Sequence, residues 1–273
     1  MNVAIIGCGY VGKAVAEYWQ KLGFVITATT TTPEKVSELE AVAQRVVVVK
    51  GNDPEGLKSV LENQGTVLLS VGAKSANEYE ETYLETAQTL VSILPQIGSL
   101  QQLIYTGSYS IYGNRNGSLV DEELPVAPEN STGKILSQTE EVLLSASTEN
   151  LGVCILRLGG IYGSGRELVK IFRNAPGTTR PGSGEDITNW IRLDDIVAGI
   201  EFVRQHRLQG IYNLVDDAHL TSRELLDRMC EKHNLPKVLW DSSLKSLRPC
   251  NALVSNQKIK DAGYQLIHPQ MIV

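Results

Sequence analysis

Short apolar runs alternate with amphipathic stretches along the first two thirds of the chain. The runs have the length of strands, are rich in β-branched residues and are almost uniformly apolar, as in strands that are buried on both faces. They lie at residues 3–6, 24–29, 45–49, 66–71, 102–106 and 152–157. Stretches with helical periodicity separate them, at residues 11–22, 33–43, 54–63, 78–94 and 134–145. This alternation predicts an α/β fold with a doubly wound parallel sheet.

The first strand runs directly into a glycine-rich turn, Gly7-x-Gly9-x-x-Gly12, and a helical pattern follows it. In a dinucleotide-binding turn the first glycine permits the sharp bend, the second lets the backbone approach a pyrophosphate, and the third allows the helix to pack on the strand. The start of the helix, at Tyr10 and Val11, offers unpaired N–H groups to the anion. We therefore predict a dinucleotide site here, with a glycine-rich turn that holds no ligand as the alternative.

The same turn matches part of a second phosphate-binding motif. Gly7 to Lys13 fits most of the P-loop pattern Gly-x-x-x-x-Gly-Lys. The next residue is Ala14, where a P-loop has the Ser or Thr that holds magnesium. The sequence therefore argues against an ATPase.

The end of the second strand bears on which dinucleotide is bound. Sites that prefer NAD usually have an Asp or Glu there to hold the ribose 2′-hydroxyl. This strand ends in four threonines, and the first acid is Glu34. Hydroxyl groups and a lysine suit a 2′-phosphate better than a carboxylate would, so we predict NADP, with NAD as the alternative. The expected contacts are Thr29, Thr30, Thr31 and Lys35.

Composition and charge narrow the class of protein. The 273 residues are 42% hydrophobic and 21% charged, and the net charge of −6 comes without a basic stripe, which argues against nucleic acid as a partner. The longest apolar stretches have the length of strands, so no membrane partner is expected. The four cysteines and four histidines are dispersed and show no metal-ligand spacing, so we expect no metal. A reduced, cytoplasmic protein without a signal peptide is the simplest expectation.

Three later segments, in matching order, resemble the extended short-chain dehydrogenase/reductase family, which includes nucleotide-sugar epimerases and dehydratases. Residues 105–113 resemble its fifth strand, with a hydroxyl residue and a Tyr-Gly. Residues 156–166 resemble its Leu-Arg…Tyr-Gly-x-Gly-Arg stretch. Residues 190–196 resemble its Tyr-Ile-His-Val-x-Asp segment, although Asp194 and Asp195 are also expected to cap the helix that follows.

The resemblance implies roles for particular residues. It implies that Ser108 hydrogen-bonds the reacting oxygen and that Asn52 lies near the adenine. It also implies that one set of residues lines the wall beside the ribose and pyrophosphate, and another lies near the nicotinamide. These sets are Val71, Gly72 and Lys74, and Gly159, Gly160 and Ile161, respectively.

The chain departs from the family in the helix after the fifth strand. Catalytic members carry Tyr-x-x-x-Lys there, in which the lysine lowers the pKa of the tyrosine. Counting back from the downstream glutamate places Thr132 or Gly133 at the tyrosine position, and Leu136 or Ser137 at the lysine position. A different acid would then be needed. Tyr112 is our candidate beside Ser108, and Tyr109 and Tyr162 are the other tyrosines considered.

The last third of the chain has a different character. Residues 163–189 are rich in Gly, Pro, Thr and Arg, which predicts a loop, and 194–205, 210–214 and 222–233 predict a helix, a strand and a helix. We expect a dinucleotide-binding core at 1–165, to which 194–215 return, and a small substrate-binding lobe at 166–193 and 216–273. Arg166 and Arg180 are the expected contacts of an anionic substrate.

Two functions compete at this level. The first is an NADP-linked oxidoreductase or epimerase that acts on a nucleotide-sugar-like or small carbonyl substrate. The second is a non-catalytic NADP(H)-binding protein that senses redox state or docks a partner. The family often forms homodimers through the helices predicted here at 78–94 and 134–145. A contiguous apolar face there would favour a homodimer, and packing of that face on the sheet is the alternative.

Overall fold

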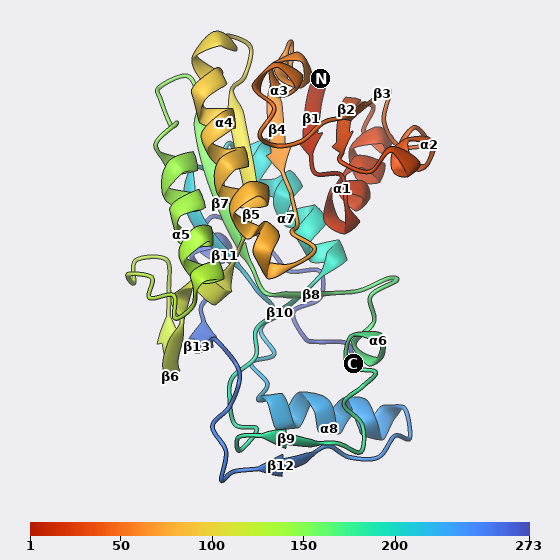
Figure 1. The fold of residues 1–273 in the computed structure, drawn as a ribbon, viewed down its shortest axis with the longest axis vertical. Coiled ribbons are helices and arrows are strands. Elements are labelled where there is room, and N and C mark those ends of the chain that lie inside the picture. Colours follow the sequence, from red (N-terminus) through yellow and green to blue (C-terminus); the bar gives the residue numbers. More distant parts are fainter. The chain divides into compact units, whose positions relative to one another are not determined.

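A seven-stranded, mostly parallel sheet dominates the computed structural model, which describes residues 1–273 (Figure 1). Its order, β11-β7-β5-β4-β1-β2-β3, reverses direction between β1 and β4. This reversal is the switch point at which doubly wound sheets bind ligands, outside the carboxyl ends of the strands. The predicted doubly wound fold is therefore confirmed. The strands are β1 (Asn2–Ile6), β2 (Val25–Thr30), β3 (Arg45–Val48), β4 (Thr66–Leu69), β5 (Gln102–Ser108), β7 (Gly152–Leu158) and β11 (Gly210–Leu214).

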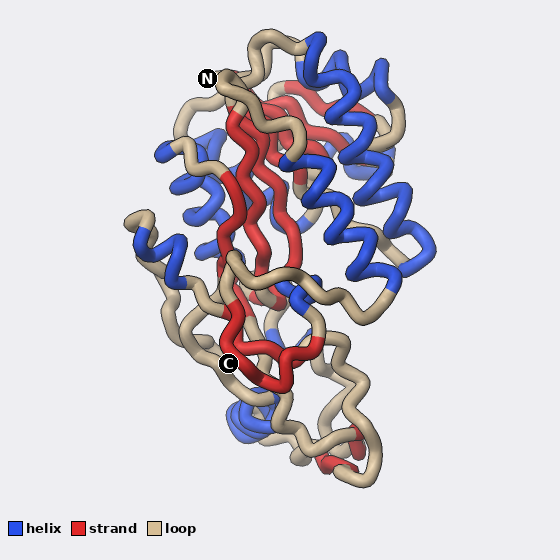
Figure 2. Tube along the Cα trace, turned by 90° about the vertical axis from the view of Figure 1, so that its left-hand side faces the viewer, coloured by secondary structure: helices blue, strands red, loops and turns tan.

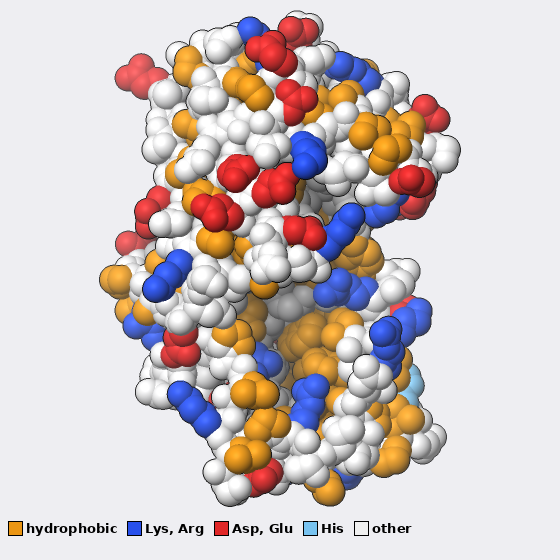
Figure 3. Space-filling view, in the orientation of Figure 1, with side chains coloured by type: hydrophobic (Ala, Val, Ile, Leu, Met, Phe, Trp, Pro, Cys, Tyr) orange, Lys and Arg blue, Asp and Glu red, His pale blue; other side chains and the backbone are white.

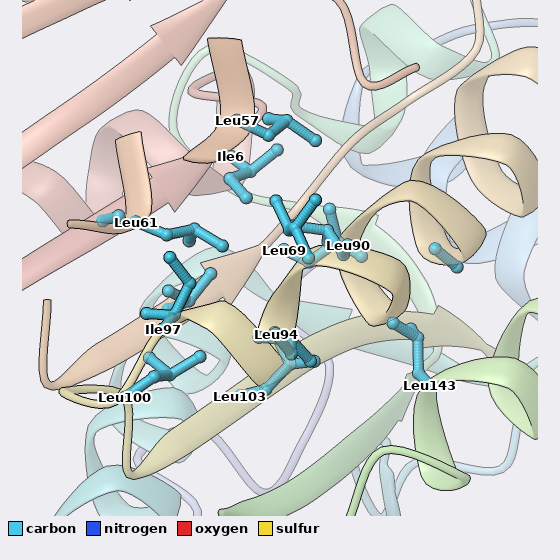
Figure 4. Close-up of a cluster of buried hydrophobic side chains, with 14 of the residues drawn as sticks. Ile6, Leu57, Leu61, Leu69, Leu90, Leu94, Ile97, Leu100, Leu103 and Leu143 are labelled. Atoms are coloured by element: carbon cyan, nitrogen blue, oxygen red, sulfur yellow. The ribbon is translucent and has the colours of Figure 1, made fainter. Parts of the chain in front are cut away.

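Helices cover both faces of this sheet (Figure 2). On one face lie α3 (Pro54–Leu61), α4 (Thr86–Ile93) and α5 (Ser131–Leu144), whose apolar residues form one cluster with the strands (Figure 4). On the other, α1 (Tyr10–Lys21) is joined to α7 (Leu193–His206) by a hydrogen bond from Trp19 Nε1 to Glu201 Oε2 at 2.8 Å. Each fully buried leucine of the cluster stabilises the fold by about 2 kcal/mol. Leu57, Leu61, Leu90 and Leu143 are such residues.

Two predicted helices are interrupted. The stretch 33–43 forms a 3-10 turn, Pro33–Lys35, and then the short α2 (Val36–Leu39). The stretch 78–94 begins with a π-helical turn, Glu80–Glu85, before α4. At that junction the Thr86 hydroxyl donates to the carbonyl oxygen of Glu81 at 3.3 Å. A side chain inserted into the backbone ladder is a known cause of such irregularity, and helical periodicity does not reveal it.

The chain divides into two compact units. The first comprises Met1–Ser108, Ser131–Arg157 and Val197–Tyr212, and the second comprises Tyr109–Asn130, Leu158–Ile196 and Asn213–Val273. The expected division, with a core at 1–165 and 194–215, stays a prediction; of these residues, 109–130, 158–165, 194–196 and 213–215 lie in the second compact unit. None of the helices combines the length and the apolar run that a membrane span needs.

The second unit contains three pairs of short parallel strands. They are β6 (Asn114–Val120) with β13 (Asn251–Val254), β8 (Gly160–Tyr162) with β10 (Trp190–Arg192), and β9 (Thr179–Pro181) with β12 (Leu239–Asp241). The helices are α6 (Leu168–Ile171), α8 (Ser222–Lys232) and α9 (Gln257–Asp261). The prediction of an unbroken loop at 163–189 was wrong, because α6 and β9 lie within it. These elements are too short for periodicity to mark them.

Buried side-chain amides connect distant segments of this second unit. Asn189 receives a hydrogen bond from Val254 N and donates one to the carbonyl oxygen of Ala252. Asn213 and Asn256 make similar bonds to Ser255 and Val215. The carboxylate of Asp195 receives bonds from the backbone of residues 267 and 268, so it fixes the C-terminal segment; the expectation that it caps its own helix was wrong.

Candidate functional site

The glycine-rich turn between β1 and α1 is built around two close approaches. Gly7 has a φ of +83°, and a Cβ atom there would lie 2.7 Å from the carbonyl oxygen of Ser70, at the end of β4. A Cβ on Gly12 would lie 2.8 Å from the carbonyl oxygen of Gly7. Only glycine tolerates both the conformation and the contact at Gly7. Both glycines are therefore required by the turn itself.

Gly9 differs from its two neighbours in the motif. A Cβ on Gly9 would meet no atom within 4 Å, so this glycine leaves open space where the others prevent a collision. Gly9 also precedes α1 without a side-chain cap, and the first turn of α1 carries no acidic residue. The N–H groups of this turn and the positive end of the helix therefore suit an anion. The geometry fits the pyrophosphate of a dinucleotide.

The threonines at the end of β2 differ in their hydrogen bonds and in their exposure. The buried hydroxyl of Thr29 accepts a hydrogen bond from Gly7 N at 3.0 Å, so it shapes the glycine turn. The hydroxyl of Thr30 accepts a bond from Thr32 N at 3.1 Å. Thr31 and Lys35 are exposed. Of the four residues expected at a 2′-phosphate, these two are therefore the ones whose side chains are available.

The remaining residues expected beside the dinucleotide follow β3 and β4. Asn52 is exposed, and its amide donates to Glu85 at 3.0 Å. Val71 is half-buried, and Gly72 and Lys74 are exposed. Figure 3 shows acidic side chains gathered on the face of the first unit. Lys50, close to Asn52 in the sequence, pairs with Glu81 at 2.9 Å.

Ser108 and Tyr112, the expected catalytic pair, lie in different environments. Ser108 is half-buried at the last position of β5. The side chain of Tyr112 is fully buried, and its hydroxyl donates to Asn213 Oδ1 at 2.9 Å. A buried hydroxyl with this partner is poorly placed to give a proton to a substrate. The catalytic role of Tyr112 stays a prediction that this geometry does not favour.

A buried ion pair fixes α5 against β7. Glu140 and Arg157 are 3% and 4% exposed, and Arg157 Nη2 lies 2.8 Å from Glu140 Oε2. Burial raises the pKa of the Glu140 carboxyl, and the guanidinium of Arg157 opposes that shift. Glu141, the next residue, is exposed. Counting from Glu140 gives Thr132 and Leu136 as the expected tyrosine and lysine positions, and counting from Glu141 gives Gly133 and Ser137, so both placements stay predictions; α5 contains no tyrosine.

The glycines expected near the nicotinamide are explained by packing within the second unit. A Cβ on Gly159 would lie 2.8 Å from the backbone of Trp190, and one on Gly160 would lie 2.8 Å from the Trp190 ring. These contacts let β8 and β10 approach each other closely. Ile161, the third residue of this set, is half-buried. A role toward a cofactor is compatible with this packing but is not required to explain it.

The two arginines expected at an anionic substrate also lie in the second unit. Arg166 lines an open groove of about 390 Å³ together with Gly165, Lys170, Ile171, Arg173 and Asn174. Arg180 does not line this groove, and its guanidinium lies 5.9 Å from the centre of the Phe172 ring. Lys170 pairs with Glu167 at 2.7 Å, so the cations of the groove outnumber the acids close to it. The groove suits an anionic group.

The similarity to known proteins decides the family. Residues 3–214 match the model of the NAD dependent epimerase/dehydratase family. The chain belongs to this family. The resemblance seen in the sequence is thereby confirmed, and the glycine turn described above lies within the matched region.

Several proteins are similar to this family member over nearly its whole length. Protein YeeZ of Escherichia coli K12 is 27% identical, with 100% of this chain and 98% of YeeZ aligned. The structure of MoeE5 in complex with UDP-glucose and NAD has a TM-score of 0.82 at 18% identity and covers 97% of this chain and 93% of MoeE5. Human epimerase family protein SDR39U1 with NADPH has a TM-score of 0.79 at 15% identity, covering 99% and 96%. The two structures support the fold.

Some residues of the groove and some residues around Tyr109 were missed by the sequence analysis. Lys170 and Arg173 share the groove with Arg166, at intervals of four and three residues. Only Lys170 lies within α6 (Leu168–Ile171), and Arg166 and Arg173 lie on either side of it, so helical periodicity could not have grouped the three residues. Arg248 and Asn189, which contact Tyr109, were missed as well. No sequence signal connects these residues, because they lie 59 or more positions apart.

Proposed function

We propose that this chain binds NADP(H), with NAD(H) as the second choice, and acts as an oxidoreductase or epimerase. Its substrate would be a nucleotide sugar or a small carbonyl compound. One observation carries the proposal. A Cβ on Gly9 would meet no other atom at the uncapped start of α1, whereas a Cβ on Gly7 or Gly12 would collide with backbone atoms. The open space at Gly9 lies beside the free N–H groups of the helix start, where a pyrophosphate would approach the backbone.

The preference for NADP rests on the end of β2. Its last residues present no carboxylate, and Thr31 and Lys35 are exposed beside it. A lysine and a hydroxyl favour the 2′-phosphate of NADP, whereas the ribose hydroxyl of NAD is usually held by an acid. Asn52, Val71, Gly72 and Lys74 complete the proposed dinucleotide contacts in this unit.

The substrate class rests on the cationic groove. Arg166 and Arg173 bring two positive charges to it, and Lys170 adds a third that Glu167 balances. Such a groove favours a diphosphate, and MoeE5, which has a similar fold, is described in complex with UDP-glucose. We assign Arg166 to the anionic part of the substrate, and Arg180 to a supporting contact. The nicotinamide would supply or accept the hydride, and Ser108 would donate a hydrogen bond to the reacting oxygen.

A second function is favoured by the composition of α5. This helix contains no tyrosine, and the resemblance to the family implies that the usual proton donor would lie there. A non-catalytic NADP(H)-binding protein that senses redox state or docks a partner would have the same dinucleotide turn. Tight binding of NADPH without turnover of any carbonyl substrate would favour this second function.

Calorimetric titration tests the proposal directly. The purified protein, first freed of any dinucleotide that copurifies, is titrated with NADPH, NADP, NADH and NAD. We expect binding of all four, with the phosphorylated pair tighter by about tenfold, or about 1.4 kcal/mol. If none of the four binds, the glycine turn serves the fold alone and both functions are excluded.

A pair of glycine variants separates binding from folding. Neither Gly9 nor Gly98 would place a Cβ within 4 Å of another atom, and both lie in the first unit. Gly9→Ala and Gly98→Ala are therefore expected to unfold at similar temperatures. We expect Gly9→Ala to lose dinucleotide affinity by about 100-fold, because its methyl group occupies the space left for the pyrophosphate, and Gly98→Ala to bind as the wild type does. Equal affinities in the two variants would contradict the proposed site.

The homodimer stays a proposal of its own. Leu90 of α4 and Leu143 of α5 are buried within the first unit, in the cluster on the sheet. Tyr79 and Tyr83, whose rings lie 5.0 Å apart, are only half-buried before α4. Sedimentation velocity of the wild type and of Tyr79→Glu tests whether this surface joins two copies. A wild type that sediments as a monomer would exclude the homodimer.

A further inference from the structure

The hydroxyl of Tyr109, the residue directly after Ser108, is contacted by Arg248 within the second unit. Arg248 Nη2 donates to the Tyr109 hydroxyl oxygen at 3.3 Å. The side chain of Asn189 lies beside this hydroxyl and lowers the pKa of Tyr109. Asn189 is itself fixed, since its amide also bonds Ala252 and Val254 of β13. The Tyr109 oxygen accepts the bond from Arg248, so the proton of Tyr109 is not used in that bond.

Arg248 has no carboxylate partner in the structure. It is half-buried, its Nε atom is buried without a hydrogen-bond partner, and its Nη2 atom otherwise reaches only the carbonyl oxygen of Ile187, at 3.4 Å. A partly desolvated cation without a counter-charge is costly. A negative charge on the Tyr109 oxygen would relieve that cost. Arg248 is thus placed to stabilise a phenolate that forms during a reaction.

The charge balance around Tyr109 decides which way the proton moves. Burial raises the pKa of Tyr109 above its usual value, and Arg248 opposes that shift without reversing it. Cys250 also faces it, and burial raises the pKa of that thiol to about 11, so the thiol is neutral at physiological pH. Tyr109 is therefore a neutral phenol at rest. Such a group is suited to give a proton, and not to take one first.

We propose that Tyr109 is the proton donor of this protein and that Arg248 supplies the positive charge that a lysine supplies in the family's usual pair. The inference rests on the proposed function, since it needs a substrate oxygen that becomes negative as hydride is transferred. The O–H bond of Tyr109 breaks as a new O–H bond forms on that oxygen. The negative charge passes to Tyr109, where Arg248 and Asn189 stabilise it, and water returns the proton. The reverse sequence serves oxidation.

The first test measures the Tyr109–Arg248 pair without any substrate. 3,5-Difluorotyrosine is placed at position 109, and its single fluorine NMR signal is followed against pH. Fluorination acidifies the phenol, so the titration falls where the protein stays folded. We expect Arg248→Gln to raise the pKa at this position by about one unit or more, and Arg248→Lys to raise it by less than half as much. A pKa that Arg248→Gln leaves unchanged would overturn the proposal, since Arg248 would then give no electrostatic support to a phenolate at position 109.

The second test measures turnover of UDP-glucose and UDP-glucuronic acid with NAD and NADP, and of a panel of small carbonyl compounds with NADPH. We expect Tyr109→Phe to lower kcat by about 100-fold or more while KM and dinucleotide affinity stay nearly unchanged. Tyr18→Phe, at an exposed tyrosine on α1, is the matched control and is expected to keep full activity. Loss in Tyr112→Phe together with full activity in Tyr109→Phe would overturn the proposal and leave the proposed function standing.

Failure of the proposed function itself is recognised separately. A wild type that binds none of the four dinucleotides in the calorimeter excludes both, whatever the fluorine titration shows. A wild type that binds NADPH but turns over no substrate is the non-catalytic alternative, and it excludes a proton donor. Turnover that requires Tyr109, together with a pKa that depends on Arg248, supports the assignment.

Discussion

The two units of this molecule hold themselves together in different ways. In the first, apolar strands pair in register over four residues, as Val3–Ile6 does with Thr66–Leu69, and most of the helices follow the strands they cover. In the second, three short strand pairs join distant segments, as Asn114 does with Asn251. A large apolar cluster therefore stabilises the first unit, whereas smaller apolar clusters and buried polar contacts together stabilise the second. The comparison teaches that a sequence pattern reveals repeated apolar burial far better than it reveals contacts between distant segments.

The exceptions in each unit sharpen this contrast. The first unit contains one buried ion pair, Glu140 with Arg157, inside an otherwise apolar packing of α5 on the sheet. In the second unit, buried amides such as Asn213 and Asn256 bond backbone groups some 40 residues away. An unpaired buried polar group costs about 1–3 kcal/mol, and an unpaired buried charge costs more. The expected effects of single substitutions follow this order.

Arg157→Met gives the largest expected effect. It leaves the Glu140 carboxylate buried without its counter-charge, and we expect a loss of about 3–5 kcal/mol in the free energy of unfolding, measured in urea at pH 7. Glu141→Gln, at the exposed neighbour, is the control and should change stability by less than about 0.5 kcal/mol. A loss below about 1 kcal/mol in Arg157→Met would mean that the apolar packing of the first unit tolerates this charge.

Asn213→Ala tests the polar contacts of the second unit. It removes the acceptor of the Tyr112 hydroxyl and the donor to the carbonyl oxygen of Ser255, so we expect a loss of about 2–3 kcal/mol. Hydrogen exchange should locate the loss in β11, which contains Asn213, and in β6 and β13, with the other strands of the seven-stranded sheet protected as before. Asn174→Ala, at an exposed asparagine of the same unit, is the control. Equal exchange in the two variants would remove the distinction between the units.

Asp216→Asn tests the pH dependence of stability in the second unit. Burial raises the pKa of Asp216 to about 7 from 3.8, and one of its carboxylate oxygens is buried without a partner. The group's contribution to stability is therefore complete below pH 3.8, falls by about 1.4 kcal/mol per pH unit above it, and is lost beyond about pH 7. The wild type should lose stability relative to Asp216→Asn as pH rises from 5 to 7. Parallel pH curves for the two proteins would show that Asp216 keeps an ordinary pKa.

Lys35→Glu gives the smallest expected effect. It tests whether a residue type near the end of β2 is enough to predict a 2′-phosphate contact in the first unit. The change places a carboxylate beside the end of β2, so we expect NADPH to bind about tenfold more weakly and NADH to bind at least as tightly as before. Lys21→Glu, at the exposed end of α1, is the control for net charge. An equal effect of both variants on NADPH would assign the change to overall charge, and not to a 2′-phosphate contact.

Most of the first unit could be predicted from the sequence. Predicted strands such as 24–29 and 102–106 lie within one or two residues of β2 and β5, because apolar periodicity depends on neighbours along the chain. The glycine turn could also be predicted, because the positive φ of Gly7 is a local backbone property that the residue type reveals. The irregular start of α4 was missed, because the hydroxyl of Thr86 enters the helix from a side chain that the pattern counts only as polar.

The sequence by itself determined the parallel, doubly wound type of the sheet and the succession of strands and helices along the chain. It also determined the glycine-rich turn and the lack of a tyrosine in α5. Those features depend on residue type, on local spacing and on backbone conformation. Only the tertiary structure decided that Thr29 supports the glycine turn, that Tyr112 is buried against Asn213, and that Arg248 reaches Tyr109. Each of these is a hydrogen bond between segments far apart in the chain. Such a bond leaves no periodic trace, because its partner is selected by the fold as a whole.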